Sequence, residues 1–181
     1  MVMMIIIFIW GLAEAMWFFI IPDVILSLYA LRTKRFKYVV YANIVAVSGA
    51  MLGGIIIFIW SSLHSESVET MMLSIPAVHD YMIEHVHSSM SDNTFTALIT
   101  GPLFGVPYKL FASAAPEHTG ILLFLVFTIP ARLLRFLSVS VIAYVLSHYV
   151  FKTLFMRMKI IIWFVVWLIV YIIYFNIHSP I

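Results

Sequence analysis

The chain has 181 residues, of which 64% are hydrophobic and 10% are charged, and its formal net charge is +2. Soluble domains are typically about half apolar and about a quarter charged. The composition therefore excludes a soluble globular protein and predicts an all-α polytopic membrane protein with a single membrane domain over 1–181. The sequence contains no cysteine, which excludes disulfides, thiol catalysis and thiolate metal sites.

Five apolar segments follow one another along the chain. The second and fifth are uninterrupted and about as long as the roughly 20 helical residues that cross a bilayer core, so each is predicted to span the membrane once. Prolines interrupt the first segment at Pro22 and the third at Pro102 and Pro107. The five segments cover residues 2–31, 38–60, 95–115, 120–150 and 160–177.

The polar connections between these segments differ in charge. "RTKRFK" (32–37) and "KTLFMRMK" (152–159) contain basic residues and no acidic ones, whereas 61–94 contains acidic residues and no Lys or Arg. Lys and Arg are concentrated in the cytoplasmic loops of membrane proteins. We therefore expect 32–37 and 152–159 to be cytoplasmic, and 61–94 to be an external polar loop on the same side as the C-terminus.

This orientation requires an odd number of crossings between the external loop and the basic loop at 152–159, although two apolar segments lie between them. The third segment is therefore predicted to be a re-entrant hairpin that enters and leaves on the outer side. Shifting the sequence by 85 residues places Pro22 on Pro107 and the second segment on the fourth. The layout predicts an inverted repeat of re-entrant hairpin plus transmembrane helix, followed by an additional C-terminal transmembrane helix. Its parts are repeat one (1–60), the external loop (61–94), repeat two (95–151) and the basic loop with the last helix (152–181).

Charged residues also lie inside the apolar segments. Each charge near a bilayer centre costs at least about 2.5–3.5 kcal/mol on insertion scales, so these residues must pair, face water or change protonation. We expect a central polar site in which carboxylates carry protons or pair with cations, and arginines bind an anion or a phosphate. The alternative is structural, with carboxylate–arginine pairs that only hold the repeats together. The residues are Glu14, Asp23, Lys109, Arg132 and Arg135, beside the hairpin breaks at Pro22 and Pro107.

Glycines are concentrated in the second segment, at Gly49, Gly53 and Gly54. Small residues allow the backbones of two membrane helices to approach closely. We therefore expect another helix of the chain to pack against this surface.

The predicted external loop is rich in histidines and carboxylates. These side chains are candidate ligands for a metal such as zinc, but their spacing is not that of an HExxH motif. A solvated loop is the favoured interpretation, so no metal and no other cofactor is predicted. The residues concerned are His79, Asp80, Glu84, His85 and His87.

The local motifs resemble those of the DedA superfamily, also called the VTT or SNARE-associated membrane protein family, and most of all its short YqaA-like branch. "EAMWFFIIPDVIL" and "ANIVAVSGAMLGG" resemble the first hairpin and the helix that follows it. "GPLFGVPYKLFASAAP" and "IPARLLRFLSV" resemble the second hairpin and the arginine-bearing helix, with Lys109 where many bacterial members carry arginines. The resemblance covers residues 5–150.

The resemblance implies a lipid translocase of the bacterial inner membrane, which moves a phospholipid or a polyprenyl phosphate between leaflets and uses protons as a candidate coupling ion. Two alternatives stay open: an ion- or proton-coupled transporter of small solutes, and a structural membrane assembly factor. No nucleophile–base set, Walker loop, Rossmann glycine motif or nucleic-acid-binding patch is evident, so neither an enzyme nor a nucleic-acid partner is expected. The expected partners are membrane lipids recognised through a phosphate headgroup, and a second copy of the chain is a further candidate.

Overall fold

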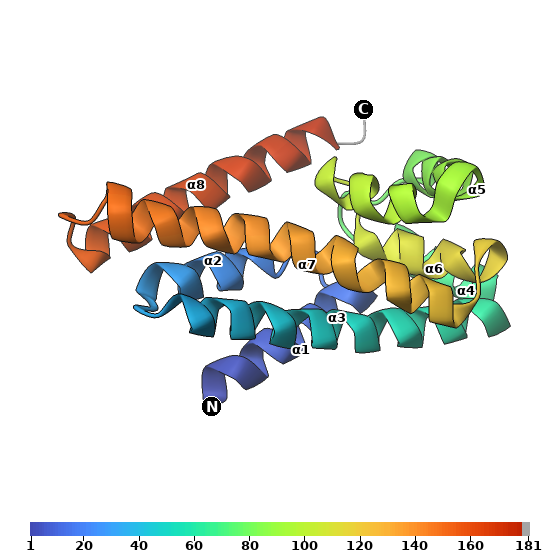
Figure 1. Ribbon diagram of the computed structural model, residues 1–181. Helices are drawn as coiled ribbons and strands as arrows, with labels where there is room; N and C mark the ends of the chain where they lie inside the picture. The colour runs from blue at the N-terminus through green and yellow to red at the C-terminus, as the bar shows by residue number, and fades with distance from the viewer. Residues whose placement is uncertain (179–181) are drawn as a thin grey trace.

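A computed structural model describes residues 1–178, and every regular element in that range is a helix. The helices form an elongated bundle in which most elements lie along the same long axis, as Figure 1 shows. In chain order they are α1 (Val2–Met16), α2 (Asp23–Arg32), α3 (Phe36–Leu63), α4 (Ser65–Leu73), α5 (Asp80–Leu103), α6 (Tyr108–His118), α7 (Ile121–Val145) with a π-helical turn η1 (Leu146–Val150), and α8 (Met156–Ile177).

Three of these helices are long and apolar enough to cross a membrane: α3, the continuous helix α7–η1, and α8. The shortest of them has 22 residues, which corresponds to about 33 Å at a rise of about 1.5 Å per residue and exceeds the ~30 Å of a hydrocarbon core. They coincide with the second, fourth and fifth apolar segments, so the predicted spans are confirmed. The chain is an integral membrane protein.

The centre of the bundle is a close contact between α1 and α3. A Cβ atom added at Gly49 would overlap the carbonyl oxygen of Phe8, and one added at Gly53 would lie 2.6 Å from that of Leu12. Any larger residue at these positions would push the two backbones apart. The predicted close helix approach is thereby confirmed, and its partner is α1. Gly54 instead faces Tyr108 of α6.

Two of the short non-helical segments lie inside the bundle. Residues 17–22 separate α1 from α2, and residues 104–107 separate α5 from α6; Pro22 and Pro107 occupy the N-cap positions of α2 and α6. Gly105 has φ = 94°, a left-handed conformation that side chains disfavour. The sequence predicts a break at Pro102 as well, but Pro102 lies inside α5, because the chain turns only after Leu103, at the left-handed Gly105.

The predicted external loop 61–94 is largely helical: it contains the last residues of α3, all of α4 and the first half of α5. Val68 and Met72 are buried on one face of α4, and Met82, Val86 and Met90 on one face of α5. These residues recur every four positions, which is the spacing of one helical face. Acidic residues separate these buried positions along the chain, so the pattern was not recognised from the sequence. The segment packs as a cap on the ends of α3, α6 and α7.

Asn93 divides α5 into two helical parts, because its φ of −162° and ψ of 106° are not helical. The Asn93 side-chain oxygen accepts a hydrogen bond of 3.0 Å from the backbone N–H of Thr96. This contact caps the first turn of the second part, which runs to Leu103. The capping segment and the short helix that leads to the second break are therefore distinct units.

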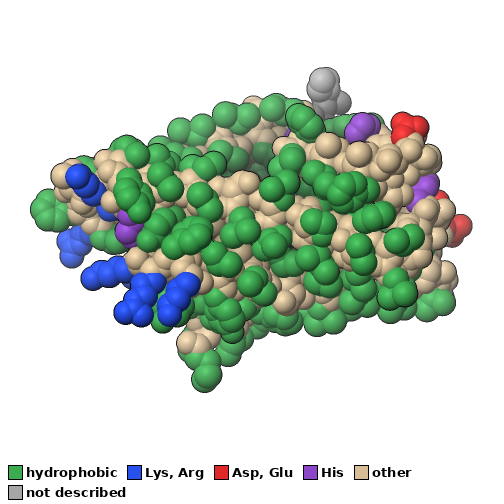
Figure 2. Space-filling view, viewed as in Figure 1, with side chains coloured by type: hydrophobic (Ala, Val, Ile, Leu, Met, Phe, Trp, Pro, Cys, Tyr) green, Lys and Arg blue, Asp and Glu red, His purple; other side chains and the backbone are tan. Residues whose placement is uncertain are grey.

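Charged side chains are segregated along the long axis (Figure 2). Lys and Arg side chains gather at the end where α2 connects to α3 and α7 connects to α8, whereas Asp and Glu side chains are visible at the opposite end. The surface between the two ends is dominated by hydrophobic side chains.

Candidate functional site

All five charged residues that the sequence places inside apolar segments lie in the middle of the bundle, on four different helices. Glu14, Asp23, Lys109 and Arg132 are each no more than 2% exposed, and the side chain of Arg135 is 15% exposed. Burial of this degree removes nearly all water from the charged groups, so their protein partners determine their free energies.

Arg132 of α7 forms an ion pair with Glu14 of α1 through its Nη2 atom. The same guanidinium carbon lies 4.2 Å from the ring centre of Tyr108 and 4.7 Å from that of Phe136, which are cation–π distances. Its Nε and Nη1 atoms have no acceptor within residues 1–178. Arg132 therefore binds one carboxylate and two aromatic rings and retains unused hydrogen-bond donors.

Asp23 of α2 faces Arg135 of α7, with 3.3 Å between Oδ2 and Nη2. Neither carboxylate oxygen of Asp23 accepts a hydrogen bond from any group in the described part of the chain. Asp23 is the first residue of α2, where the helix dipole favours a negative charge. Glu14 accepts a hydrogen bond from Arg132, whereas Asp23 is held to Arg135 by the attraction of the two charges alone.

Lys109 of α6 does not pair with a carboxylate among the described residues. Its ammonium group donates a 2.7 Å hydrogen bond to the backbone carbonyl of Phe18, inside the break between α1 and α2. The cation that follows the second break is thus bound to the first break, and the two breaks meet at the centre of the molecule.

A cavity of about 210 Å³ lies between these two breaks. Glu14, Lys109 and Arg135 are its charged walls, and the remaining lining is largely apolar or aromatic. Arg132 and Asp23 do not line the cavity, but each forms an ion pair with a residue that does: Arg132 with Glu14, and Asp23 with Arg135. The other lining residues are Phe19, Ile21, Ile75, Pro76, Val78, Gly105, Val106, Pro107, Val170, Tyr171 and Tyr174.

Helix α8 closes one side of this region through polar contacts that sequence reasoning missed. The Tyr171 hydroxyl accepts a 3.0 Å hydrogen bond from the backbone N–H of Ile21 in the first break. Trp163 and Trp167 both donate their indole N–H to the hydroxyl of Ser27, at 2.9 and 3.0 Å. The sequence did contain a signal for this contact: two tryptophans four residues apart on an apolar helix lie on one face and can reach the same partner.

A second polar contact that was not predicted from the sequence joins α3 and α7. Asn43 of α3 and Ser140 of α7 are fully buried and exchange side-chain hydrogen bonds of 3.1 and 3.2 Å. Asn43 is a polar residue inside an otherwise apolar span, which is itself a signal of helix–helix hydrogen bonding.

The histidines and carboxylates of the predicted external loop do not assemble into one site. His79 hydrogen-bonds to the backbone carbonyl of His178 and stacks on Tyr81. His87 alone among those five residues belongs to a compact cluster of potential metal ligands within residues 1–178, and its neighbours there are Glu117 and His118.

No family model matches the chain, and no curated protein or solved structure is significantly similar to it. The interpretation of the site therefore rests on its own geometry. Three cations and two carboxylates meet at the centre, which gives one positive charge in excess when all five are ionised. An anion is the ligand that this excess favours.

Proposed function

We propose that this protein is a lipid translocase of the DedA type, which moves a phospholipid or a polyprenyl phosphate between the two leaflets of a membrane. The observation that carries the proposal is the cavity between the two helix breaks, with Lys109 and Arg135 in its wall and one positive charge in excess around it. The phosphodiester of a phospholipid carries one negative charge and would balance that excess, and the phosphomonoester of a polyprenyl phosphate carries about 1.5–2 negative charges.

The helix boundaries support an inverted repeat. Helices α2 and α6 begin at Asp23 and Tyr108, and helices α3 and α7 begin at Phe36 and Ile121, so each pair is separated by 85 residues. Helices α1, α2 and α6 have 15, 10 and 11 residues, and about 20 are needed to cross a bilayer core. We infer that α1–α2 and the second half of α5 with α6 are re-entrant hairpins that enter from opposite sides.

The separation of charge supports one orientation in the membrane. The basic end holds the connections at 32–37 and 152–159, and the opposite end holds the acidic segment 61–94 (Figure 2). We propose that the basic end is cytoplasmic and that the acidic end and the end of α8 are external. The proposed location is the inner membrane of a bacterium.

The size of the cavity limits how a lipid binds. Pockets that enclose drug-sized ligands have volumes of about 300–1,000 Å³, and this one has about 210 Å³. We infer that the phosphate group enters the cavity while the hydrocarbon chains stay outside it. A mainly apolar groove of about 170 Å³ lies between α2, α7 and α8 and offers a surface for a hydrocarbon chain. On α8 it ends at Val166 and Trp167, one turn before the residues of that helix that line the cavity.

Reconstitution into liposomes that contain labelled phospholipid or labelled polyprenyl phosphate tests the proposal. We expect the protein to accelerate leaflet exchange of at least one of these lipids, and Arg135→Gln to reduce the rate at least tenfold. Arg157→Gln is the matched control, because Arg157 is exposed at the basic end. Exchange no faster than in empty liposomes, at any pH or membrane potential, would refute lipid translocation.

The small volume of the cavity also favours a second candidate, a transporter of small anions coupled to protons. Inorganic phosphate contains the same charged group as a lipid headgroup and fits a smaller space. Flux of labelled phosphate into protein-containing liposomes, together with unchanged lipid exchange, would support this candidate over lipid translocation.

A further inference from the structure

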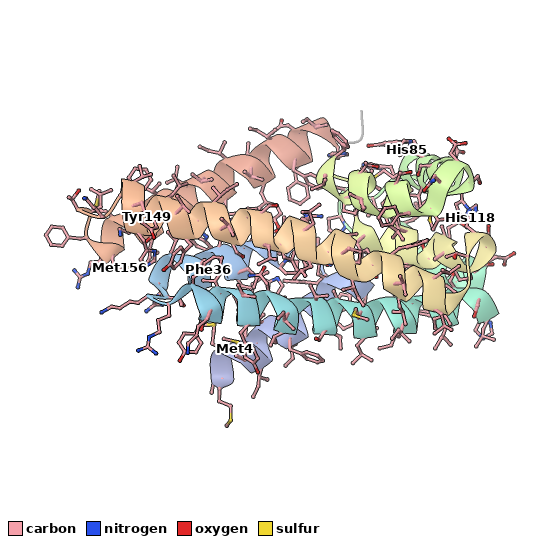
Figure 3. The ribbon with its side chains drawn as sticks, viewed as in Figure 1. Met4, Phe36, His85, His118, Tyr149 and Met156 are labelled. Atoms are coloured by element: carbon pink, nitrogen blue, oxygen red, sulfur yellow. The ribbon has the colours of Figure 1, made fainter. Side chains whose placement is uncertain are left out.

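A compact cluster of histidine and carboxylate side chains lies at the acidic end of the molecule, apart from the central cavity. His87 comes from the first half of α5, and Glu117 and His118 are the last two residues of α6. Figure 3 shows His118 at that end, where α5 and α6 lie next to each other. The potential ligand atoms of His87, Glu117 and His118 all lie within 4.8 Å of one another.

The distances within the cluster fit a tetrahedral metal site. His87 Nδ1 lies 3.3 Å from Glu117 Oε2 and 3.3 Å from His118 Nε2. Zinc binds imidazole nitrogen and carboxylate oxygen at about 2.0–2.1 Å, so two ligands of a tetrahedral site are separated by about 3.3–3.4 Å. These two separations therefore match the edges of a zinc tetrahedron, and the third, between Glu117 and His118, is within 4.8 Å.

Hydrogen bonds alone satisfy the polar atoms of this cluster poorly. His87 Nδ1 faces both a carboxylate oxygen and the ring nitrogen of His118, yet it can hold only one proton. If it donates that proton to Glu117, its own lone pair is not available to His118; if it accepts from His118, it faces the carboxylate with a lone pair. A divalent cation between the three atoms would be attracted by all of them at once.

The surroundings also favour a cation. Glu117 supplies a negative charge, and both ligands of α6 lie at its C-terminus, where the helix dipole is negative. The side chains of His87 and Glu117 are 37% and 60% exposed, so an ion from solution can reach them. A cavity of about 30 Å³ beside His87 and Glu117 is also lined by Glu69 of α4.

We propose that His87, Glu117 and His118 bind one divalent transition-metal ion of the zinc type, with water or Glu69 as the fourth ligand. Two imidazoles and one carboxylate are a ligand set that zinc uses, and they leave one position open. The ion would connect α5 to α6 and hold the α4–α5 cap in place. That cap includes Ile75, Pro76 and Val78, which line the central cavity. The metal site does not depend on which molecule the central cavity binds.

Zinc titration of the full-length protein in detergent, purified with its affinity tag removed, tests this proposal. Competition with a fluorescent zinc chelator measures stoichiometry and affinity, and the visible absorption of bound Co²⁺ reports tetrahedral coordination. We expect one ion per chain, and at least tenfold weaker binding in His118→Gln and in Glu117→Gln. Excess zinc should raise the melting temperature of the unmodified protein but not that of His118→Gln or Glu117→Gln, because binding stabilises only a folded state that carries the site.

His85→Gln is the matched control. His85 lies on the same helix two residues before His87 and is exposed, so it points away from the cluster and its replacement should leave zinc binding unchanged. Glu117→Gln keeps the proposal testable if a histidine variant folds poorly, because Glu117 is largely exposed. Unchanged zinc affinity in both His118→Gln and Glu117→Gln, or an equal loss in His85→Gln, would overturn the proposal.

Discussion

Arg132 of α7 and Glu14 of α1 are separated by 118 residues in the chain and form an ion pair in the buried centre of the molecule. The two side chains of the pair are 1% and 3% exposed. Charges buried to this extent must compensate each other, because no water replaces the hydration that they lose. The pair therefore fixes α1, which precedes the first break, against α7, the long helix that follows α6.

Replacing one member of this pair should destabilise the protein more than replacing both. Removing one partner of a buried ion pair costs roughly 3–5 kcal/mol, because the other charge is left uncompensated. We expect Glu14→Leu and Arg132→Met each to lower the free energy of unfolding by this amount, and the double variant to recover about 2 kcal/mol or more. Unfolding by SDS titration from mild detergent measures all four proteins. Additive effects would contradict the pairing.

Asp23 is expected to affect anion binding more than stability. Asp23→Asn removes the negative charge opposite Arg135, and Arg135 lines the central cavity, where a ligand can reach it. We therefore expect Asp23→Asn to fold and to bind a phosphate-bearing lipid more tightly, and Arg135→Gln to bind it less tightly. Native mass spectrometry with added lipid measures both changes. Glu84→Gln is the control, since Glu84 is exposed on α5; weaker lipid binding in Asp23→Asn would argue against an anion site.

The contact between α1 and α3 should not tolerate a side chain. Gly49→Leu places a Cβ atom where it overlaps the Phe8 carbonyl oxygen, and overpacking of this kind costs about 3 kcal/mol. A marked fall in melting temperature is expected. Gly120→Ser is the control, because no atom lies within 4 Å of a Cβ at Gly120 and it occupies the N-cap of α7, where serine is favoured. Equal melting temperatures for the two variants would exclude a tight contact.

The proposed orientation is testable by cysteine labelling, because the chain has no cysteine of its own. Ser88→Cys lies in the acidic segment and Lys34→Cys in the basic one, and both positions are exposed. In intact cells we expect an impermeant maleimide to label Ser88→Cys and to leave Lys34→Cys unlabelled until the cells are opened. The reverse pattern would show that the acidic end is cytoplasmic.

The sequence predicted much of the fold through hydrophobicity, length and charge. The segments 38–60, 120–150 and 160–177 are long apolar helices, as their length and hydrophobicity predicted. The segment 61–94 was not predicted to be helical. Its buried methionines and valines recur with helical spacing, but acidic and polar residues separate them along the chain. That face is apolar because it packs on the ends of α3, α6 and α7, which only the tertiary structure reveals.

The sequence by itself determined which residues have to be compensated, because a charge in an apolar segment requires a partner wherever it is placed. Glu14, Asp23, Lys109, Arg132 and Arg135 were therefore identifiable without coordinates. The tertiary structure alone decided the partners: Arg132 with Glu14, Arg135 with Asp23, and Lys109 with a backbone carbonyl of the first break. It also placed α8 along one side of the central cavity. In the same way it placed His87 in contact with His118, which is 31 residues away in the chain. Such pairings depend on distances between helices, which the packing of the whole bundle sets and no local pattern in the chain encodes.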